Sequence, residues 1–582
     1  MNRLINRLLP SVAIVALMLS AAVAHAVPAK RGLRQVEQPD GTVITLRLVG
    51  DETFRTYTTP DGFPVDQADN GEYRYLRSDG RLSNVMVVAP ERPSGAELAF
   101  LKANKGLLSV ERLRTLRVEE GSLRRLRGAT AEDAADFAAK APARIPSTSQ
   151  SSGFNRIPVL MVAYSDVPFL HGDNTPTAFG PYFNEGKKCG RQYFEDQSNG
   201  LYKPQFDLYG PVTLPNPRTT YGANSRGDDV GVGRMVAEAC QMLDAQVDFS
   251  RYDNDGDGEC DVVIVLYAGI GENSGKLKDA VWPCSWDLVS SDFGKTLTLD
   301  GVTINSFGVF NELNDTNQSQ IDGIGVFCHE FSHCLGLPDF YPTNGTSYFG
   351  MDVWSLMDYG CYNDDGYTPV GYTAYEKSYF GWIDLEEAAD TQHYTLPAMN
   401  AGDRSTDRAV KVTNPKNSNE YFILENRARH GWDAYIPAEG MLITHVNYSQ
   451  TRWAANTVNN THTQGMTIIP ADNVLTVSSL KGDLWPYGSA TALTATSTPK
   501  ATLADGSVMP QGVTGITRNA DGTVSFTIGR AGSGIGDVLA DPSASSPAEY
   551  FTLQGVRLPS RPSLPGIYLV RLGQEVKKVL IR

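Results

Sequence analysis

The sequence predicts a mixed α/β (α+β) domain between residues 154 and 390, preceded by a strand-rich leader and followed by all-β modules. Two strongly apolar runs, Ile157–Tyr164 and Val262–Tyr267, are typical of strands that are buried on both faces of a sheet. An apolar helix is predicted over about Ile321–Leu335. Beyond Thr391, short strand-like runs separated by turns continue to about Arg530, which favours a β-sandwich-like module over 391–530.

Length and composition set the outer limits of the interpretation. At 582 residues the chain is too long for one hydrophobic core, so several domains are expected. Its 41% hydrophobic and 20% charged residues are typical of an ordinary globular protein. The net charge of −15 argues against a nucleic-acid partner, because phosphate binding requires a basic surface.

The first 26 residues have the pattern of a secretory signal peptide. Two arginines precede an apolar stretch from Leu8 to about Ala24, and the small-residue pattern Ala24-His25-Ala26 closes it. We therefore expect cleavage after Ala26 and a protein that is secreted, either extracellular or attached to the cell surface. A membrane anchor is the alternative, but Pro10 interrupts the run and no later segment is apolar enough to span a bilayer.

The predicted helix carries the pattern His329-Glu330-Phe331-Ser332-His333. Histidines four residues apart project from one face of a helix, one turn apart, so both imidazoles can bind one zinc ion. Glu330 lies beside the first ligand. A carboxylate that is not itself a metal ligand can act as the general base toward an attacking water.

A third ligand is predicted just after this helix. Gly336 stands where a helix ends most easily in a left-handed conformation, and Pro338 prevents the helix from resuming. The reversed chain then brings Asp339 toward the two histidines from another direction. Two imidazoles and one carboxylate leave a fourth position open, as catalytic zinc requires. The alternative for Asp339 is a carboxylate that bonds to the local backbone.

This arrangement resembles the metzincin metallopeptidases, which extend HExxH with a glycine and a third ligand and then pass a methionine-containing turn beneath the metal. The resemblance implies a metzincin-like catalytic domain. Met357 fits the methionine turn, although a lone methionine is more often core packing. Tyr359 matches the tyrosine that some metzincins place over the metal to stabilise the oxyanion, and a packed or surface aromatic is the alternative.

A closer resemblance is to the immune inhibitor A-like metalloproteases, secreted bacterial peptidases that use aspartate as the third ligand. It is carried by Ile324–Asp339, Tyr252–Gly258 and Glu420–Arg427, and it extends over roughly 155–530. Ser332 stands where family members commonly have glycine, at a position that faces away from the ligands.

An acidic, glycine-containing loop precedes the second apolar strand and predicts a structural calcium site. Its carboxylates can surround a hard cation with oxygens, and without a cation they would repel one another. The loop lacks the final glutamate of an EF-hand, because Ile264 stands at that position. A solvated acidic turn is the alternative. The predicted ligands are Asp253, Asp255, Asp257 and Asp261.

Seven cysteines lie in the middle of the chain, so at least one thiol is free or paired between molecules. Cys328 and Cys334 are six residues apart on one predicted helix, which separates them by about 9 Å along its axis and excludes a disulfide between them.

The leader, residues 27–153 including a linker rich in Ala, Ser and Pro, is expected to be a propeptide that keeps the zinc site closed during export. Arginines between 112 and 127 and the linker that follows offer sites for maturation cleavage. The leader contains no cysteine, so a thiolate from it cannot block the metal, whereas a carboxylate could. Asp51 is a candidate, but a simple turn at Gly50-Asp51 is favoured.

A second linker, 531–548, precedes a short β unit over 549–582. This unit resembles the C-terminal sorting domains of bacterial type IX secretion cargo, which implies the secretion machinery as a partner. A plain β-hairpin appendage is the alternative.

Together these features predict a secreted zinc-dependent endopeptidase, made as a zymogen, that hydrolyses proteins or peptides with Glu330 as general base. One alternative is a surface adhesion or binding protein with a vestigial peptidase domain. The complete set of metal ligands argues against that, because a degenerate enzyme would be expected to have lost at least one. A zinc hydrolase acting on a non-peptide bond is a third class.

Overall fold

The computed structural model describes residues 25–116, 155–530 and 549–581, except 53, 89–93, 108, 115, 172–175, 226, 227, 401–405, 554, 563, 565, 573 and 574. The apolar stretch of the predicted signal peptide, the linkers 129–153 and 531–548, and the arginines at 117, 124, 125 and 127 lie outside the described residues.

A mostly parallel sheet forms the core of the region between residues 155 and 385 and is built on the two apolar runs. β7 (Arg156–Ala163) and β12 (Val263–Tyr267) pair in parallel at its middle, and the strand order is β13-β16-β12-β7-β8. β16 (Ser306–Asn311) and β8 (Gln205–Thr213) are parallel to them, whereas β13 (Cys284–Asp287) is an antiparallel edge strand. Both predicted strands are confirmed within one residue.

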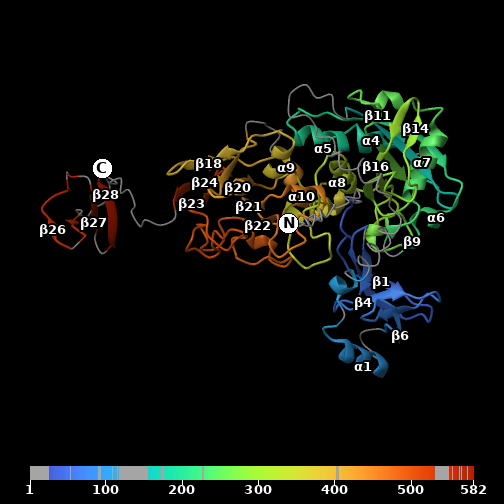
Figure 1. Cartoon of the computed structure of the whole chain (residues 1–582), viewed down its shortest axis with the longest axis horizontal. Helices are drawn as coiled ribbons and strands as arrows, with labels where there is room; N and C mark the ends of the chain where they lie inside the picture. The colour runs from blue at the N-terminus through green and yellow to red at the C-terminus, as the bar shows by residue number, and fades with distance from the viewer. Residues whose placement is uncertain are drawn as a thin grey trace, which may run out of the picture.

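Helices cover the two faces of this sheet, which explains why its central strands are apolar throughout. On one face, Val159 and Ile264 join the hydrophobic core that surrounds α8 (Ile324–Cys334) (Figure 1). On the other face, Leu160 and Val265 pack in a second core with α7 (Val232–Leu243). The helix predicted over 321–335 is confirmed, three residues shorter at its start and one shorter at its end.

Shorter elements complete this region. The helices are α4 (Gly180–Phe183), α5 (Gly190–Gln197), α6 (Thr219–Gly222) and α9 (Ala374–Tyr379). The strands are β9 (Asn224–Ser225), β10 (Asp228–Asp229), β11 (Glu259–Cys260), β14 (Leu297–Leu299) and β15 (Val302–Ile304). The 3-10 turns are η2 (Pro176–Phe179), η3 (Phe249–Tyr252), η4 (Glu272–Ser274), η5 (Asp352–Trp354) and η6 (Tyr359–Gly366).

The leader folds as an antiparallel meander of six strands in sequence order, drawn in blue in Figure 1. Its elements are β1 (Arg34–Glu37), β2 (Val43–Gly50), β3 (Arg55–Thr58), β4 (Pro64–Gln67), β5 (Tyr73–Leu76), β6 (Leu82–Met86) and α1 (Gly95–Asn104). Leu46, Leu48 and Tyr57 of this sheet belong to the same hydrophobic core as α7, so the leader packs directly on the central region.

Among the described residues after 385, most of the regular elements are β-strands. One sheet has the order β17-β19-β20-β21-β22, and a second has the order β18-β24-β23. The elements are β17 (Glu386–Glu387), β18 (His393–Leu396), β19 (Ala409–Thr413), β20 (Glu420–Arg427), η7 (Gly431–Asp433), β21 (Gly440–Asn447), α10 (Gln450–Ala454), β22 (Met466–Ile468), η8 (Leu480–Gly482), β23 (Gln511–Arg518) and β24 (Val524–Arg530). Ile423, Leu442 and Trp453 share one core with α8, so hydrophobic packing is continuous across residue 390.

The last described residues form a small antiparallel sheet with the order β26-β25-β27-β28. Its strands are β25 (Glu549–Phe551), β26 (Arg557–Leu558), β27 (Gly566–Leu572) and β28 (Glu575–Ile581). None of the described helices has the length and hydropathy needed to cross a bilayer. All seven cysteines are free thiols, so the prediction that Cys328 and Cys334 are not bonded to each other is confirmed.

Candidate metal centre

Helix α8 presents both predicted histidine ligands inside the protein. His329 is fully buried and His333 is 6% exposed. The helix ends at Cys334, and Gly336 follows with φ of +103°, a left-handed conformation that glycine adopts without steric cost. The chain then reverses and brings the buried Asp339 back to the histidines, as the sequence predicts.

Three donor atoms converge at this point with spacings that suit a tetrahedral metal. The Nε2 atoms of His329 and His333 are 3.0 Å apart, and each lies 3.2 Å from Oδ1 of Asp339. Ligands at about 2.0–2.1 Å from a tetrahedral zinc lie about 3.3 Å from one another. Oδ1 of Asp339 is buried and has no hydrogen-bond partner within the described structure. The donor set therefore fits zinc.

Hydrogen bonds fix the orientation of all three side chains. Nδ1 of His329 donates to the Leu356 carbonyl (2.8 Å), and Nδ1 of His333 donates to the Leu337 carbonyl (2.7 Å). These bonds leave each Nε2 free for a metal. The amide of Asn456 donates to Oδ2 of Asp339 (2.6 Å), and its oxygen accepts the Asp339 N–H (2.8 Å).

The electrostatics of the centre follow from burial. Burial lowers the pKa of His333, which favours the neutral imidazole that metals bind. Burial alone would raise the pKa of Asp339, but the two adjacent imidazoles lower it below its usual range. The pKa of Glu330 is raised by burial, and its Oε2 has no hydrogen-bond partner among the described residues.

The segment predicted to pass beneath the metal lies next to the ligands. Met357 is fully buried, its carbonyl accepts the Phe340 N–H (2.8 Å), and its neighbour Leu356 holds His329. The guanidinium carbon of Arg31 lies over the Tyr359 ring, 3.4 Å from the ring centroid. Burial raises the pKa of Tyr359 to about 12, and Arg31 opposes that rise.

The N-terminal segment (residues 25–31) passes through this centre. The backbones of His25 and Ser285 form an antiparallel bridge at the open edge of β13, with N–H···O distances of 2.9 and 2.7 Å. The Val27 N–H donates to Oε1 of Glu330 (2.8 Å), and the Tyr341 hydroxyl donates to the Ala26 carbonyl (2.5 Å). The Ala26–Val27 peptide group therefore lies between the general base predicted from the sequence and a hydroxyl donor.

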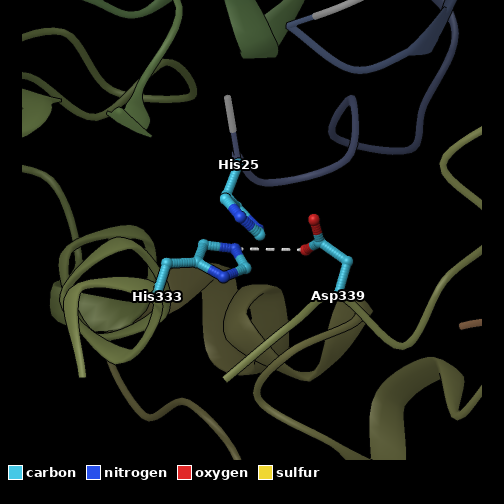
Figure 2. Close-up of side chains that lie close together, drawn as sticks. All are labelled: His25, His333 and Asp339. Atoms are coloured by element: carbon cyan, nitrogen blue, oxygen red, sulfur yellow. Dashed lines mark ion pairs between the residues drawn. The ribbon is translucent and has the colours of Figure 1, made fainter. Parts of the chain in front are cut away.

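Figure 2 shows the His25 side chain facing His333 and Asp339. The rings of His25 and His333 are 4.7 Å apart, and a nitrogen of His25 belongs to a group of three possible metal ligands with those two residues. Burial lowers the pKa of His25 to about 3. Because the predicted signal peptide includes His25, cleavage after Ala26 would leave this position beside the ligands open.

Two leader carboxylates that are adjacent in sequence, Asp51 and Glu52, differ in their surroundings. Asp51 accepts the Phe54 N–H (3.0 Å) and pairs with Arg114 (3.2 Å), which agrees with the simple turn favoured for this residue. Glu52 is 8% exposed, and its pKa is raised by burial and by the charges of Asp51, Asp339 and Glu330. Glu52, the neighbour of the predicted Asp51, is thus a leader carboxylate whose pKa is raised by burial and also by the charges of Asp339 and Glu330.

The acidic loop brings three of its four predicted ligands together. Carboxylate oxygens of Asp253, Asp255 and Asp257 lie within 4.8 Å of one another. Asp261 is not in this group, because its Oδ2 accepts bonds from the backbone (3.0 Å) and side chain (2.6 Å) of Asn254. Calcium binding by the loop stays a prediction.

Comparisons with known proteins agree with this geometry. Residues 163–382 match the catalytic domain of immune inhibitor A peptidase M6. Immune inhibitor A from Bacillus thuringiensis subsp. alesti is 27% identical over 284 residues, 44% of this chain and 40% of that protein. Pre-pro-metalloprotease PrtV from Vibrio cholerae is 28% identical over 263 residues, 39% of this chain and 28% of that protein.

Residues 163–382, the peptidase domain, are therefore similar to the catalytic domain of immune inhibitor A-type metallopeptidases. The three predicted zinc ligands lie inside this peptidase domain. Glu330, Met357 and Tyr359 lie inside it as well. The chain spans less than half the length of either relative.

Several contributors to the centre of the peptidase domain were missed by sequence reasoning. Tyr341 is two residues beyond Asp339, so its proximity could have been anticipated from the chain reversal. Asn456 is 117 residues from Asp339 and outside the matched region, and no local spacing indicates it. Val27 reaches Glu330 across 303 residues of sequence.

Proposed function

We propose that this protein is an exported zinc-dependent endopeptidase that is latent until its leader is displaced. The observation that carries the proposal is the Ala26–Val27 peptide group, held with its nitrogen at Glu330 and its oxygen at Tyr341. A peptide bond in an extended chain fits the centre, because the edge strand β13 pairs through the backbone of Ser285 with His25 of such a chain.

His329, His333 and Asp339 would hold the zinc ion, which would supply Lewis-acid chemistry toward a carbonyl and a water molecule. Glu330 accepts a proton from the attacking water and passes it to the leaving nitrogen. The 2.8 Å contact between Oε1 of Glu330 and the Val27 nitrogen supports this role, because it places the carboxylate within hydrogen-bond distance of a peptide nitrogen. Tyr341 donates a hydrogen bond to the carbonyl oxygen as negative charge develops there. Tyr359 is a second candidate donor, available once Arg31 leaves its ring.

The leader supplies latency in this proposal. Cleavage after Ala26 removes His25 and makes the Val27 nitrogen a new α-amino group beside Glu330. The exported chain then holds the product half of a peptide, with no bond left to hydrolyse at that point. Arg55 of the leader, with its partners Asp229 and Glu272 (2.7 Å), anchors the leader sheet to the peptidase domain in a buried cluster.

An adhesion protein with a vestigial peptidase domain has less support. Every residue that the chemistry requires is present, and their donor atoms are spaced for a metal.

Export rests on the signal-peptide pattern. The C-terminal sheet, with exposed Val556 and Leu564, is proposed to engage the secretion machinery.

Hydrolysis of casein by the processed protein tests the function. We expect activity to be lost in 1,10-phenanthroline and restored by added zinc, because the ligand set suits that ion. A calcium-selective chelator at matched concentration is the control for non-specific metal loss. Absence of hydrolysis by a folded, zinc-loaded, processed protein would refute the proposal, as would full activity after zinc has been removed.

The acidic loop gives a separate prediction for stability. If Asp253, Asp255 and Asp257 hold calcium, a calcium-selective chelator lowers the melting temperature by about 5 °C, because the ion binds only the folded loop. The variant Asp255→Asn should melt at the same temperature with and without the chelator. Equal melting temperatures for the unsubstituted protein in both conditions would remove calcium from the proposal.

A further inference from the structure

An acidic pocket lies beside the metal centre and holds the side chain of Lys30. The Lys30 ammonium pairs with the carboxylates of Asp315 and Asp365, and its side chain is 15% exposed. The Lys30 backbone N–H donates to the Asn273 carbonyl at the rim of the pocket (2.9 Å). The N-terminal segment thus places a lysine in this pocket while its Ala26–Val27 peptide group lies at Glu330.

The pocket is a formed polar site. Asp322, on its floor, accepts bonds from the side-chain amides of Asn311 (2.9 Å) and Asn314 (3.2 Å). Asn311 also lines the pocket, is 5% exposed, and its Oδ1 has no hydrogen-bond partner among the described residues. A buried acceptor oxygen beside carboxylates suits a ligand that carries several N–H donors, as an ammonium group does.

The charge balance of the pocket depends on the leader. Lys30 and Arg34, which lies 3.6 Å from Asp315, both belong to the leader. The peptidase domain itself supplies Lys276, 3.8 Å from Asp315. When the leader departs, Asp315, Asp322 and Asp365 stay in the pocket, and the ammonium of Lys276 stays near Asp315. Burial raises the pKa of Asp322 to about 7, so Asp315 and Asp365 carry most of the negative charge. A partly buried negative pocket of this kind attracts a cationic side chain.

We propose that this pocket, formed by Asn311, Asp315, Asp322 and Asp365, is a substrate subsite for a lysine side chain, which Lys30 occupies in the latent chain. Lys30 is the fourth residue after the Ala26–Val27 bond. The enzyme therefore favours peptides with lysine at the fourth position on the carboxyl side of the cleaved bond. The inference rests on the proposed function, since it names the substrate class of that same site.

The test uses full-length protein activated by limited proteolysis, with casein hydrolysis as proof of activation. Three fluorogenic peptides differ only at the fourth residue after the cleaved bond, which is lysine, norleucine or glutamate, and mass spectrometry verifies the bond. We expect kcat/KM to be about tenfold higher for lysine than for norleucine, chiefly through KM, and lowest for glutamate.

The variant Asp365→Asn should reduce the lysine preference to less than about threefold. Asparagine suits this position because Asp365 has φ of +56°, which asparagine tolerates. Asp244→Asn, which removes the same charge at an exposed site, is the matched control and should keep the full preference. Binding of the leader peptide Val-Pro-Ala-Lys-Arg-Gly and of its norleucine analogue gives a readout without catalysis, with the lysine peptide binding about tenfold tighter.

The outcomes separate the two claims. Casein cleavage with equal kcat/KM for lysine and norleucine overturns the subsite and leaves the peptidase intact. A lysine preference that Asp365→Asn does not alter also overturns it. Failure to cleave casein refutes the proposed function and the subsite with it.

Discussion

Replacing Glu330 by glutamine is expected to lower casein hydrolysis at least about 1,000-fold while the protein stays folded and binds zinc. Glutamine keeps the shape of the side chain and can still contact the Val27 nitrogen, but it cannot accept a proton from water. Glu330 makes no contribution to the three converging donor atoms, so the zinc content should be unchanged. Steady-state kinetics and metal analysis of the same preparation check both parts.

The ligand Asp339 provides the matched comparison. Asp339→Ala should lose both activity and zinc, because it removes the oxygen that lies 3.2 Å from each histidine nitrogen. Circular dichroism controls for folding in both variants. Loss of zinc from Glu330→Gln would contradict the role of Glu330 as a base that does not bind the metal. A full zinc content in Asp339→Ala would contradict the role of Asp339 as a ligand.

The convergence of the three predicted ligands was predictable because their geometry is local. The two histidines are four positions apart on one helical face, and a glycine turn of a few residues returns Asp339 to them. The central strands were predictable for a similar reason, since a run buried on both faces must be apolar throughout. Spacing along the chain determines these contacts directly.

Contacts between distant segments could not be predicted in this way. Asn456 orients Asp339 from a part of the chain expected to be a separate β-module, and the two regions share one hydrophobic core. Asp51 is a candidate blocking carboxylate with a simple turn favoured, and nothing in the local sequence indicates its neighbour Glu52, whose burial depends on how the leader packs. Such effects arise from tertiary docking, which leaves no periodic pattern in a single sequence.

Latency should weaken when the N-terminal segment loses its hold on the peptidase domain. Arg31 makes two bonds to Asp352 (2.9 and 2.6 Å) and stacks on Tyr359. We expect Arg31→Ala to raise casein hydrolysis by the unprocessed chain about tenfold, because lost charge-assisted bonds increase the fraction of molecules with an open centre. Initial rates are measured on protein that electrophoresis shows to be uncleaved.

Arg77 offers the control, because it is also a leader arginine but pairs with the exposed Asp79 on the surface. Arg77→Ala should leave the basal rate unchanged, and both variants should reach the same activity after the leader has been removed by limited proteolysis. An unchanged basal rate in Arg31→Ala, or an equal rise in both variants, would mean that the N-terminal segment does not hold the enzyme closed. A rise confined to Arg31→Ala places the latent state at the metal centre, because that side chain contacts the peptidase domain there.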